Sequence, residues 1–520
     1  MNKFVLYFSW ALSLCLGACT SKSEVIVVLT SDVHGHINHG YARVSTFVDS
    51  LRAVENNVLL LDNGDYLQGT TAVYFSNLMD NSGAPNIMTT VFNKMNYSAI
   101  GVGNHDIEAG KNVFDRLYSS VQCPVVCANV TYISTGEPYF QPYIVKEAGG
   151  CKVAILGLTT PYVSTWLSER LRPGLAFEPI GESASYWVER IHRKVHPDVL
   201  ICLIHSGYKG GATGFLGEEN DVENLALTVP GIDLICYGHD HKPYTGVVLS
   251  EGGKEVQVMN PGANGKYVAV AVISNGGHKN RTIVPRLEKV SQLPADSLFM
   301  QAVMPFMDRV ADYADTPIAV LKNDIRSDDV FKGPCGWVDE VHRAQLDLAG
   351  LGSDLLADVS FAASLASGQE LLAGPLLLKD FFTWFPFENS LCLVQMTGQE
   401  IKDYLEYSYR SEEDEIFNFD TAAGIIYKVD STATYGHRIE IVSMADGQKF
   451  DFAKKYNVAM NSYRSMGGGG HLIEGLGWTS AQLTQRRVWE GKMDIRRLIM
   501  DWEGSRTPFE ALPLNQWSYK

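Results

Sequence analysis

Residues 232–241 read Ile-Asp-Leu-Ile-Cys-Tyr-Gly-His-Asp-His. The first six are mostly apolar, which is typical of a buried strand, and a glycine then leads directly into two histidines and an aspartate. The same order, an apolar run followed by metal-ligand residue types, occurs at four earlier places in the chain. Because a strand carries its end loop to the rim of a sheet, we expect the five loops to converge on one point.

The four earlier motifs are Asp32-Val33-His34, Gly64-Asp65, Gly103-Asn104-His105-Asp106 and His205-Ser206-Gly207. The apolar runs before them cover residues 25–29, 58–61, 99–102 and 199–204. One such motif would be weak evidence of a site. Five in order, all built from carboxylate, imidazole and carboxamide groups, predict a two-metal hydrolytic site.

The motifs supply enough ligands for two divalent ions. Two ions about 3.5 to 4 Å apart can share a hydroxide that attacks phosphorus, and they can clamp the phosphoryl group. Asp65 is the expected bridge, because an aspartate after a glycine at a strand end can offer one oxygen to each ion. The other expected ligands are Asp32, His34 and His241 for the first ion and Asn104, His205 and His239 for the second. Imidazole nitrogens with carboxylate and amide oxygens suit Mn²⁺, Zn²⁺, Co²⁺ or iron rather than Ca²⁺.

His105 directly follows the ligand Asn104 and is the candidate catalytic residue. It could stabilise the transferring phosphoryl oxygens or protonate the leaving oxygen, and the alternative is a purely supporting role. Glu108, three residues on, can hold the other ring nitrogen at the start of a helix. The neighbouring aspartates Asp106 and Asp240 are ligand types, but loop-structuring hydrogen bonds are the commoner use of such residues.

Composition favours an enzyme with a small substrate. The chain has 520 residues, of which 46% are hydrophobic and 20% charged, so it can form two or more cores. The net charge of −16 argues against binding of a nucleic-acid polymer, which needs a basic surface. A small anionic substrate is still compatible with this charge if metal ions supply a local positive field.

The start of the chain predicts a lipoprotein. Residues 1–18 have a weakly basic start, an apolar stretch and then small residues, which is typical of a signal peptide. Leu16-Gly17-Ala18-Cys19 resembles a bacterial lipobox and implies cleavage before Cys19 and lipid on that residue. Since no later run of eighteen apolar residues occurs, we expect attachment to a membrane through the lipid alone, in the bacterial cell envelope, at the outer membrane or facing the periplasm. An ordinary cleaved signal is the alternative.

The mature chain divides into three parts. Residues 24–290 alternate strand-like runs with helical stretches, which predicts an α/β domain of layered sheets and helices. Residues 291–315 predict a connecting helix, and residues 316–520 predict a smaller domain of mixed strands and helices.

These motifs resemble the calcineurin-like metallophosphoesterases and, more narrowly, the exported two-domain nucleotidases. The resemblance implies a layered α/β metal domain, joined by a helix to a smaller α/β nucleotide-specificity domain that rotates between open and closed states. It also implies the metal ligands given above, with His105 and Glu108 as the catalytic pair. The family usually shows Asn-His-Glu-x-Asp, whereas residues 104–108 read Asn-His-Asp-Ile-Glu, which places a longer carboxylate beside the histidine.

The resemblance extends to base binding in the second domain. Family members stack the nucleobase between two aromatic rings, one from a Pro-aromatic-x-Asn segment and one from a glycine-rich segment. Pro386-Phe387-Glu388-Asn389 and the stretch from Asn461 to Gly470, which contains Tyr463, resemble these segments. The resemblance therefore implies that Phe387, Asn389 and Tyr463 bind a small nucleotide. Stacking is worth ~1 to 3 kcal/mol per base, and glycines let a backbone approach a ligand closely.

Two segments bear on the substrate. Members that act on 5′-nucleotides carry Gly-Gly-Ile-Arg and Gly-Gly-Asp-Gly segments, whereas this chain has Ala357 to Ala363 without an arginine, and Gly469 in place of the aspartate. With Phe417-Asn418-Phe419-Asp420, these segments are more similar to the 2′,3′-cyclic-nucleotide 2′-phosphodiesterase/3′-nucleotidase branch. A 5′-nucleotidase or UDP-sugar hydrolase is the alternative.

Functions of another class need different sequence features. A nucleotide-binding lipoprotein without catalysis would lack a ligand or part of the catalytic pair, and none is missing from the motifs. A metal-storing or adhesive protein would not need the paired aromatic residues.

Overall fold

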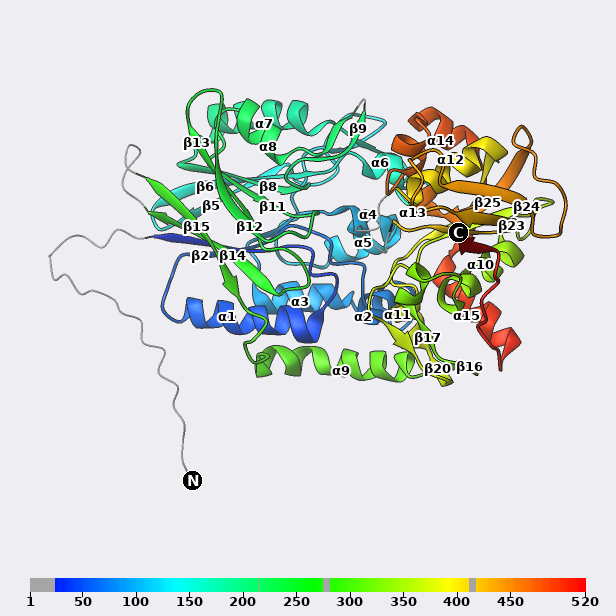
Figure 1. Cartoon of the computed structure of the whole chain (residues 1–520). Coiled ribbons are helices and arrows are strands. Elements are labelled where there is room, and N and C mark those ends of the chain that lie inside the picture. Colours follow the sequence, from blue (N-terminus) through cyan, green and yellow to red (C-terminus); the bar gives the residue numbers. More distant parts are fainter. Residues whose placement is uncertain (1–23, 215, 275–280, 411–417) are drawn as a thin grey trace.

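The computed structural model describes residues 24–214, 216–274, 281–410 and 418–520, which form two lobes (Figure 1). The signal segment 1–18, Cys19 and Phe417 lie outside the described residues. Within the described part of the chain, no helix has the length and apolarity needed to cross a lipid bilayer.

The first lobe contains two stacked sheets. One has the strand order β15-β14-β1-β2-β3, from β1 (Val25–Thr30), β2 (Val58–Asp62), β3 (Ala99–Ile100), β14 (Tyr267–Ser274) and β15 (Thr282–Lys289). The other has the order β12-β13-β11-β8-β6-β5, from β5 (Tyr143–Ala148), β6 (Cys151–Thr159), β8 (Val199–His205), β11 (Leu234–Tyr237), β12 (Tyr244–Leu249) and β13 (Glu255–Asn260).

The alternation of side chains along the strands builds the layers. Val25, Val27 and Leu29 of β1 belong to the core between the sheets, whereas Ile26 and Val28 belong to the core under the helices. Helices α1 (Ala42–Arg52) and α3 (Ile87–Met95) cover the first sheet, and α7 (Ile180–Val195) and α8 (Val222–Thr228) cover the second. Because β1, β2, β3, β8 and β11 are buried on both faces, the ligand motifs follow almost wholly apolar runs.

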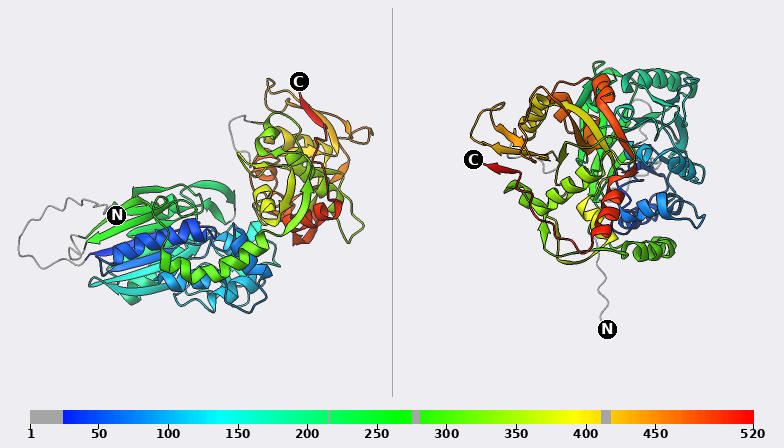
Figure 2. Two further views of the ribbon diagram at one scale, coloured as in Figure 1. Left: turned by 90° about the horizontal axis from the view of Figure 1, so that it is seen from below. Right: turned by 90° about the vertical axis from the view of Figure 1, so that its right-hand side faces the viewer.

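The connecting helix is α9 (Ser297–Ala314), within the expected residues 291–315. Asp296 caps it by accepting hydrogen bonds from the backbone N–H groups of Leu298 and Phe299. Figure 2 shows α9 lying along the first lobe, and Phe299 and Val303 bury their side chains in that lobe's core. The helix is therefore packed on the metal-ligand lobe up to the start of the second lobe.

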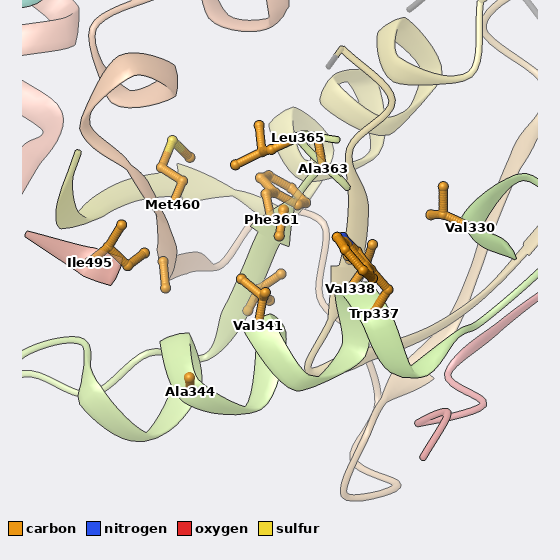
Figure 3. Packing of buried hydrophobic residues seen from close by; sticks show 14 of the residues in the cluster. Val330, Trp337, Val338, Val341, Ala344, Phe361, Ala363, Leu365, Met460 and Ile495 are labelled. Carbon is orange, nitrogen blue, oxygen red and sulfur yellow. The ribbon is translucent and has the colours of Figure 1, made fainter. Parts of the chain in front are cut away.

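The second lobe has a main sheet with the order β22-β18-β25-β21-β26, from β18 (Val359–Ala362), β21 (Ser390–Thr397), β22 (Thr421–Ala423), β25 (Lys455–Asn461) and β26 (Arg487–Asp494). A smaller sheet has the order β24-β23-β27, from β23 (Ile425–Val429), β24 (Ile439–Met444) and β27 (Trp517–Tyr519). The helices that pack on them include α10 (Gly336–Leu348), α11 (Leu378–Trp384), α12 (Gly398–Ser408) and α15 (Ile495–Arg506). Figure 3 shows Val338 and Val341 of α10 packed near Phe361, Met460 and Ile495.

A single glycine separates two strands of the second lobe. The strand β22 ends at Ala423, and β23 begins at Ile425. Gly424 between them has φ 91°, and a Cβ there would overlap the backbone oxygen of Asp358. The glycine therefore lets the chain pass from the main sheet to the smaller sheet.

An aromatic and cationic contact joins the lobes. The guanidinium of Arg496 lies 3.9 Å from the ring centroid of Phe382 and 5.4 Å from that of Tyr74, which belongs to the first lobe. Arg496 also donates hydrogen bonds to the backbone oxygens of Phe385 (2.7 Å) and Pro386 (2.9 Å). This contact fixes the segment that leads into Phe387, the first expected base-stacking residue.

Candidate active site

The ligand motifs meet at one edge of the two sheets. Strands β1, β2 and β3 are parallel to one another in the first sheet, and β6, β8 and β11 are parallel in the second. The carboxyl ends of parallel neighbours lie at the same edge, so the loops after β1, β2, β3, β8 and β11 come together there.

Two groups of side chains lie at this edge with ligand atoms close together. Asp32, His34 and His241 form one group, and Asp65, His205 and His239 form the other. Within each group, the nitrogen and oxygen atoms that could bind an ion lie within 4.8 Å of one another. The first group has 3.1 Å between the Nε2 atoms of His34 and His241.

The second group is deeply buried and is connected to the first. His205 Nε2 lies 3.2 Å from Asp65 Oδ2 and 3.9 Å from Asp32 Oδ1. Asn104, the seventh expected ligand, lines the same cavity as Asp65. Among the described residues, neither Asn104 Oδ1 nor His205 Nε2 has a hydrogen-bond partner, although both atoms are buried. Such orphaned polar atoms fit a site that is completed by bound cations.

The electrostatic field of the group also favours a cation. Burial disfavours the charged form of His205, but the carboxylates of Asp65 and Asp32 outweigh burial and raise the pKa of His205 to about 10. Burial likewise opposes the Asp65 carboxylate, but His205 and His105 hold its pKa well below the usual value. Carboxylates that stabilise positive charge at this point would also stabilise divalent ions.

The ligand loops adopt an uncommon backbone conformation. Five of the seven expected ligands have φ in the left-handed region, namely Asp32 (51°), His34 (52°), Asp65 (60°), His239 (75°) and His241 (58°). Such residues cost ~1 to 3 kcal/mol each and persist only where the surroundings fix them. Here the backbone N–H of Asp32 donates to the Gly64 oxygen (3.0 Å), and that of His34 donates to the Asp65 oxygen (2.9 Å).

Glycines in the motifs allow the loops to approach one another. A Cβ on Gly103 would overlap Asp65 Oδ1, and a Cβ on Gly238 would overlap Ser31 Oγ and come close to Asp32 Oδ2. Gly103 and Gly238 each precede an expected ligand. They are needed because the ligand loops approach one another too closely for a side chain, and not because of a local turn.

Asp106 ties the loops after β2 and β3 together. Its carboxylate accepts hydrogen bonds from the backbone N–H groups of Gly103 (2.8 Å), Asp65 (2.9 Å), Tyr66 (3.0 Å) and Leu67 (3.0 Å). Asp240 accepts from the backbone of Tyr208 (3.0 Å) in the same way. Both aspartates structure loops, as the sequence suggested.

His105 and Glu108 form a hydrogen-bonded pair on the short helix α4 (Asn104–Glu108). His105 Nδ1 lies 2.6 Å from Glu108 Oε2, and His105 Nε2 lies 4.0 Å from Asp65 Oδ2. Burial opposes the charged form of His105, but Asp65 and Glu108 outweigh it and raise the pKa of His105 to about 9. The spacing of three residues on a helix places both side chains on one face, so the longer carboxylate reaches the ring.

Two residues near His239 were not expected from the sequence. Glu219 Oε1 lies 2.9 Å from His239 Nε2, and the ring of Trp166 stacks on the His239 ring at a centroid distance of 5.7 Å and an angle of 21°. The other site residues were found as metal-ligand residue types in a loop directly after an apolar strand. Neither Glu219 nor Trp166 fits this pattern, so the sequence did not point to them.

Four of the expected metal ligands (Asp65, Asn104, His239 and His241) and the expected base-binding residues line one cavity between the lobes. Its volume is about 340 Å³, and its walls include His105 and Glu108 from the first lobe and Phe387, Asn389 and Tyr463 from the second. Phe387 is 38% exposed and Tyr463 is 47% exposed, so both rings are open to a ligand in the cavity.

Two glycines of the glycine-rich segment lie against side chains of that segment. A Cβ on Gly468 would overlap the ring of Tyr463, and a Cβ on Gly469 would overlap Arg464 Nη1. These glycines therefore make room for side chains of the same segment. Asn389 supports Tyr463 by accepting a hydrogen bond from its backbone N–H (3.0 Å).

Arg464 occupies the space beside Gly469 and is fixed by a buried ion pair. Its Nε and Nη2 donate to the two carboxylate oxygens of Asp420 at 2.9 and 2.8 Å. Burial opposes the Asp420 carboxylate, but Arg464 outweighs it and lowers the pKa of Asp420 to about 2. After β18 the chain leads to Leu365, which has φ 58° and lines the cavity.

Comparisons with known proteins match both lobes. The family model of the calcineurin-like phosphoesterases matches residues 26–243, and that of the 5′-nucleotidase C-terminal domain matches residues 309–475. The 2′,3′-cyclic-nucleotide 2′-phosphodiesterase/3′-nucleotidase of Haemophilus influenzae is 24% identical over 539 residues, which cover 86% of this chain and 80% of that protein.

A longer relative and a solved structure are also similar. The trifunctional nucleotide phosphoesterase protein YfkN of Bacillus subtilis is 24% identical over 575 residues, which cover 95% of this chain but only 38% of that protein. The structure of the 5′-nucleotidase precursor from Thermus thermophilus has a TM-score of 0.70 at 22% identity and covers 95% of this chain and 99% of that chain. At this identity the structural match shows the shared fold.

We predict that His105→Ala keeps its metal ions but slows hydrolysis of bis(p-nitrophenyl) phosphate by roughly 10²-fold or more, because the variant loses the imidazole that Glu108 holds. Metal analysis and steady-state kinetics of the purified variant would measure both quantities. Glu108→Gln should show a smaller loss of the same kind.

Asp65→Ala is the contrasting variant, since loss of the expected bridging carboxylate should release both ions as well as abolish turnover. A His105→Ala variant with turnover near that of the wild type would assign His105 a supporting role. Full occupancy of both metal sites in Asp65→Ala would show that Asp65 does not bridge the two ions.

Proposed function

We propose that this chain, a phosphoester hydrolase that belongs to the calcineurin-like metallophosphoesterases and carries a 5′-nucleotidase C-terminal domain, hydrolyses 2′,3′-cyclic nucleotides and 3′-nucleotides. One observation carries the proposal. The catalytic pair, four of the seven expected metal ligands (Asp65, Asn104, His239 and His241) and two half-exposed aromatic rings line the same cavity between the lobes. A nucleotide can then place its phosphate at the ligand groups and its base between the rings.

The residues present fit two divalent ions, for which we propose Mn²⁺, Zn²⁺ or Co²⁺. When bound by the seven expected ligands, such ions supply Lewis acidity and lower the pKa of bound water. The chain itself contributes a positioned imidazole. Because Glu108 holds Nδ1 of His105 at 2.6 Å, Nε2 is the atom left to face a phosphoryl group. His105 can there stabilise the phosphoryl oxygens or give a proton to the leaving oxygen.

The second lobe positions the base. Phe387 and Tyr463 come from different segments of that lobe, and Asn389 connects the segments by its hydrogen bond to the backbone of Tyr463. The contact of Arg496 with Tyr74 and Phe382 sets the distance between the rings and the metal loops. The base and the phosphate are therefore held by separate lobes.

The choice of the cyclic and 3′ substrates rests on the second lobe's cavity wall. Arg464 is turned toward Asp420 and lies against Gly469, the position where the family resemblance implies an aspartate in 5′-specific members. Leu365, after β18, presents an apolar side chain to the cavity, and residues 357–363 contain no arginine. The groups that the resemblance implies for the phosphate and ribose of a 5′-nucleotide are therefore missing from these two segments. The name of the Haemophilus influenzae relative supports the same choice.

A 5′-nucleotidase or UDP-sugar hydrolase is the second candidate, because the second lobe matches the 5′-nucleotidase C-terminal domain over residues 309–475. A nucleotide-binding protein without catalysis is disfavoured, since all seven expected ligands and the catalytic pair occur in the chain.

A comparison of substrates tests the proposal. With purified protein and Mn²⁺, we expect faster turnover of 2′,3′-cAMP and 3′-AMP than of 5′-AMP or a UDP-sugar. A clear preference for 5′-AMP would overturn the proposed substrate and leave the metallophosphoesterase assignment in place. No turnover of any of the four by protein that holds two ions would favour the binding protein.

A second prediction concerns the aromatic rings. Phe387→Ala and Tyr463→Ala should each raise KM for 3′-AMP by about 5- to 150-fold, which corresponds to ~1 to 3 kcal/mol of lost stacking. Hydrolysis of bis(p-nitrophenyl) phosphate should change far less, since that substrate has no base.

Tyr435→Ala is the matched control, because Tyr435 is 54% exposed on the same lobe and does not line the cavity. Equal losses on both substrates in the Phe387 and Tyr463 variants would mean that the rings support the lobe rather than the base.

We also propose that the enzyme works in the bacterial cell envelope, attached by lipid on Cys19. The lipobox-like sequence Leu16-Gly17-Ala18-Cys19 supports this proposal. Expression of Cys19→Ser in a bacterial host should move the protein from the membrane pellet to the soluble fraction. A variant that still sediments with membranes after a salt wash would contradict lipid attachment at this residue.

A further inference from the structure

Two glutamates of the second lobe are fully buried, far from the expected metal ligands in the sequence. Glu340 belongs to α10 and Glu503 to α15, and these two helices pack on each other (Figure 1). Neither side chain has any exposed surface. A buried carboxylate is unfavourable unless hydrogen-bond donors and opposite charges compensate it, so the partners of each group decide its charge.

The two glutamates differ in their partners. Glu340 Oε1 accepts a hydrogen bond from Arg506 Nη1 (2.6 Å), and Glu340 Oε2 accepts one from Arg343 Nη1 (2.5 Å). Among the described residues, no N–H or hydroxyl group donates a hydrogen bond to either carboxyl oxygen of Glu503. Arg506 Nη1 lies 3.6 Å from Glu503 Oε2, which is an ion-pair distance but too long for a hydrogen bond. The surroundings therefore stabilise Glu340 as an anion and do not stabilise Glu503 in that form.

We propose that Glu503 carries a proton, which it donates to the carboxylate of Glu340, and that this pair is a pH-sensitive contact between α10 and α15. Two carboxylates cannot hydrogen-bond to each other because both only accept, whereas a carboxyl group and a carboxylate can. The proton also removes a buried negative charge that no donor compensates.

The electrostatics of the pair agree with this geometry. Burial raises the pKa of Glu503 to about 8, and the charge of Glu340 and its hydrogen bond with Glu503 act in the same direction. Arg506 and Arg343 act to lower this pKa but do not outweigh burial. The pair therefore binds one proton at neutral pH, as adjoining carboxyl groups do when they cannot both ionise.

The other ionisable groups around α15 have roles of their own. The remaining elements packed on this helix are β16 (Pro317–Leu321), α11 and β26, and β16 has no ionisable side chain. The groups of α11, β26 and α10 have the following partners or places: Lys379 pairs with Asp315, Asp380 accepts from the backbone of Leu377, Arg487 pairs with Glu490, Lys492 lines a cavity between the lobes, Asp494 caps α15, and Asp339 accepts from the backbone of Leu514.

The proton gives the second lobe a defined pH dependence. The pKa of Glu503 in the folded protein lies above its ordinary value of 4.5, so the folded state holds an extra proton between these two values. The stability that Glu503 contributes is then complete below about pH 4.5 and is lost as the pH rises to about 8. Above that pH, two buried anions face each other between α10 and α15. Since α15 also carries Arg496, the contact supports the helix that joins the lobes.

Thermal unfolding of the whole metal-loaded protein tests the proposal. Glu503→Gln keeps the shape of the side chain but cannot ionise. The difference in Tm, variant minus wild type, should grow by about 2 °C or more between pH 5 and pH 9. Glu503→Met also removes the charge and should show the same trend. Glu510→Gln is the matched control, because Glu510 is exposed on the same lobe, and its difference in Tm should not change with pH.

Infrared spectroscopy measures the proton itself. The difference spectrum of wild type minus Glu503→Gln should contain the C=O band of a protonated carboxyl group at pH 7, and the band should be absent at pH 9. A Tm difference that is constant with pH in both Glu503 variants would overturn the proposal, and so would the absence of this band at pH 7. Neither measurement uses a nucleotide or turnover, so the result is independent of the proposed substrate.

Discussion

The left-handed turns after β1, β2 and β11 are the constraint on which the site depends. They bring Asp32, Asp65 and His239 from separate loops toward a common point. Residues with a Cβ rarely adopt this backbone conformation without support from their surroundings. The support comes from hydrogen bonds between the loops. Gly103 and Gly238 allow the loops to come this close, because a side chain at either position would collide with Asp65 or Asp32. The cost of these turns is offset by the layered core beneath them, whose strands are buried on both faces.

The second lobe completes the cavity rather than the metal-ligand groups. All the residues of the two ligand groups come from the first lobe, whereas Phe387 and Tyr463, which line the same cavity, come from the second. Arg496 lies at the junction, because its guanidinium lies over Phe382 and Tyr74 while its N–H groups hold the chain before Phe387. The groups proposed for the chemistry and for base recognition therefore belong to separate lobes.

The glycines of the glycine-rich segment make contacts that the sequence pattern did not predict. Gly468 and Gly469 make room for the ring of Tyr463 and the guanidinium of Arg464. Arg464 is then bound by both oxygens of buried Asp420, so its charge is neutralised within the lobe instead of being offered to a substrate phosphate. The wall of the cavity at Arg464 consequently depends on its buried ion pair with Asp420, a residue from a different segment of the chain.

The sequence alone predicted the apolar strands of the first lobe and the ligand types that follow them, because each motif is an apolar run followed by its loop. The aromatic segments of the second lobe were implied by the resemblance to a family. The sequence also placed His105 and Glu108 on one helical face, since three residues span nearly one turn. Only the tertiary structure decided the break at Gly424, the use of Gly468 and Gly469, the junction at Arg496, and the approach of Glu219 and Trp166 to His239. The contacts of Gly424, Arg496, Glu219 and Trp166 join residues far apart in the chain, and they depend on how a hairpin and two lobes dock, which no local periodicity records.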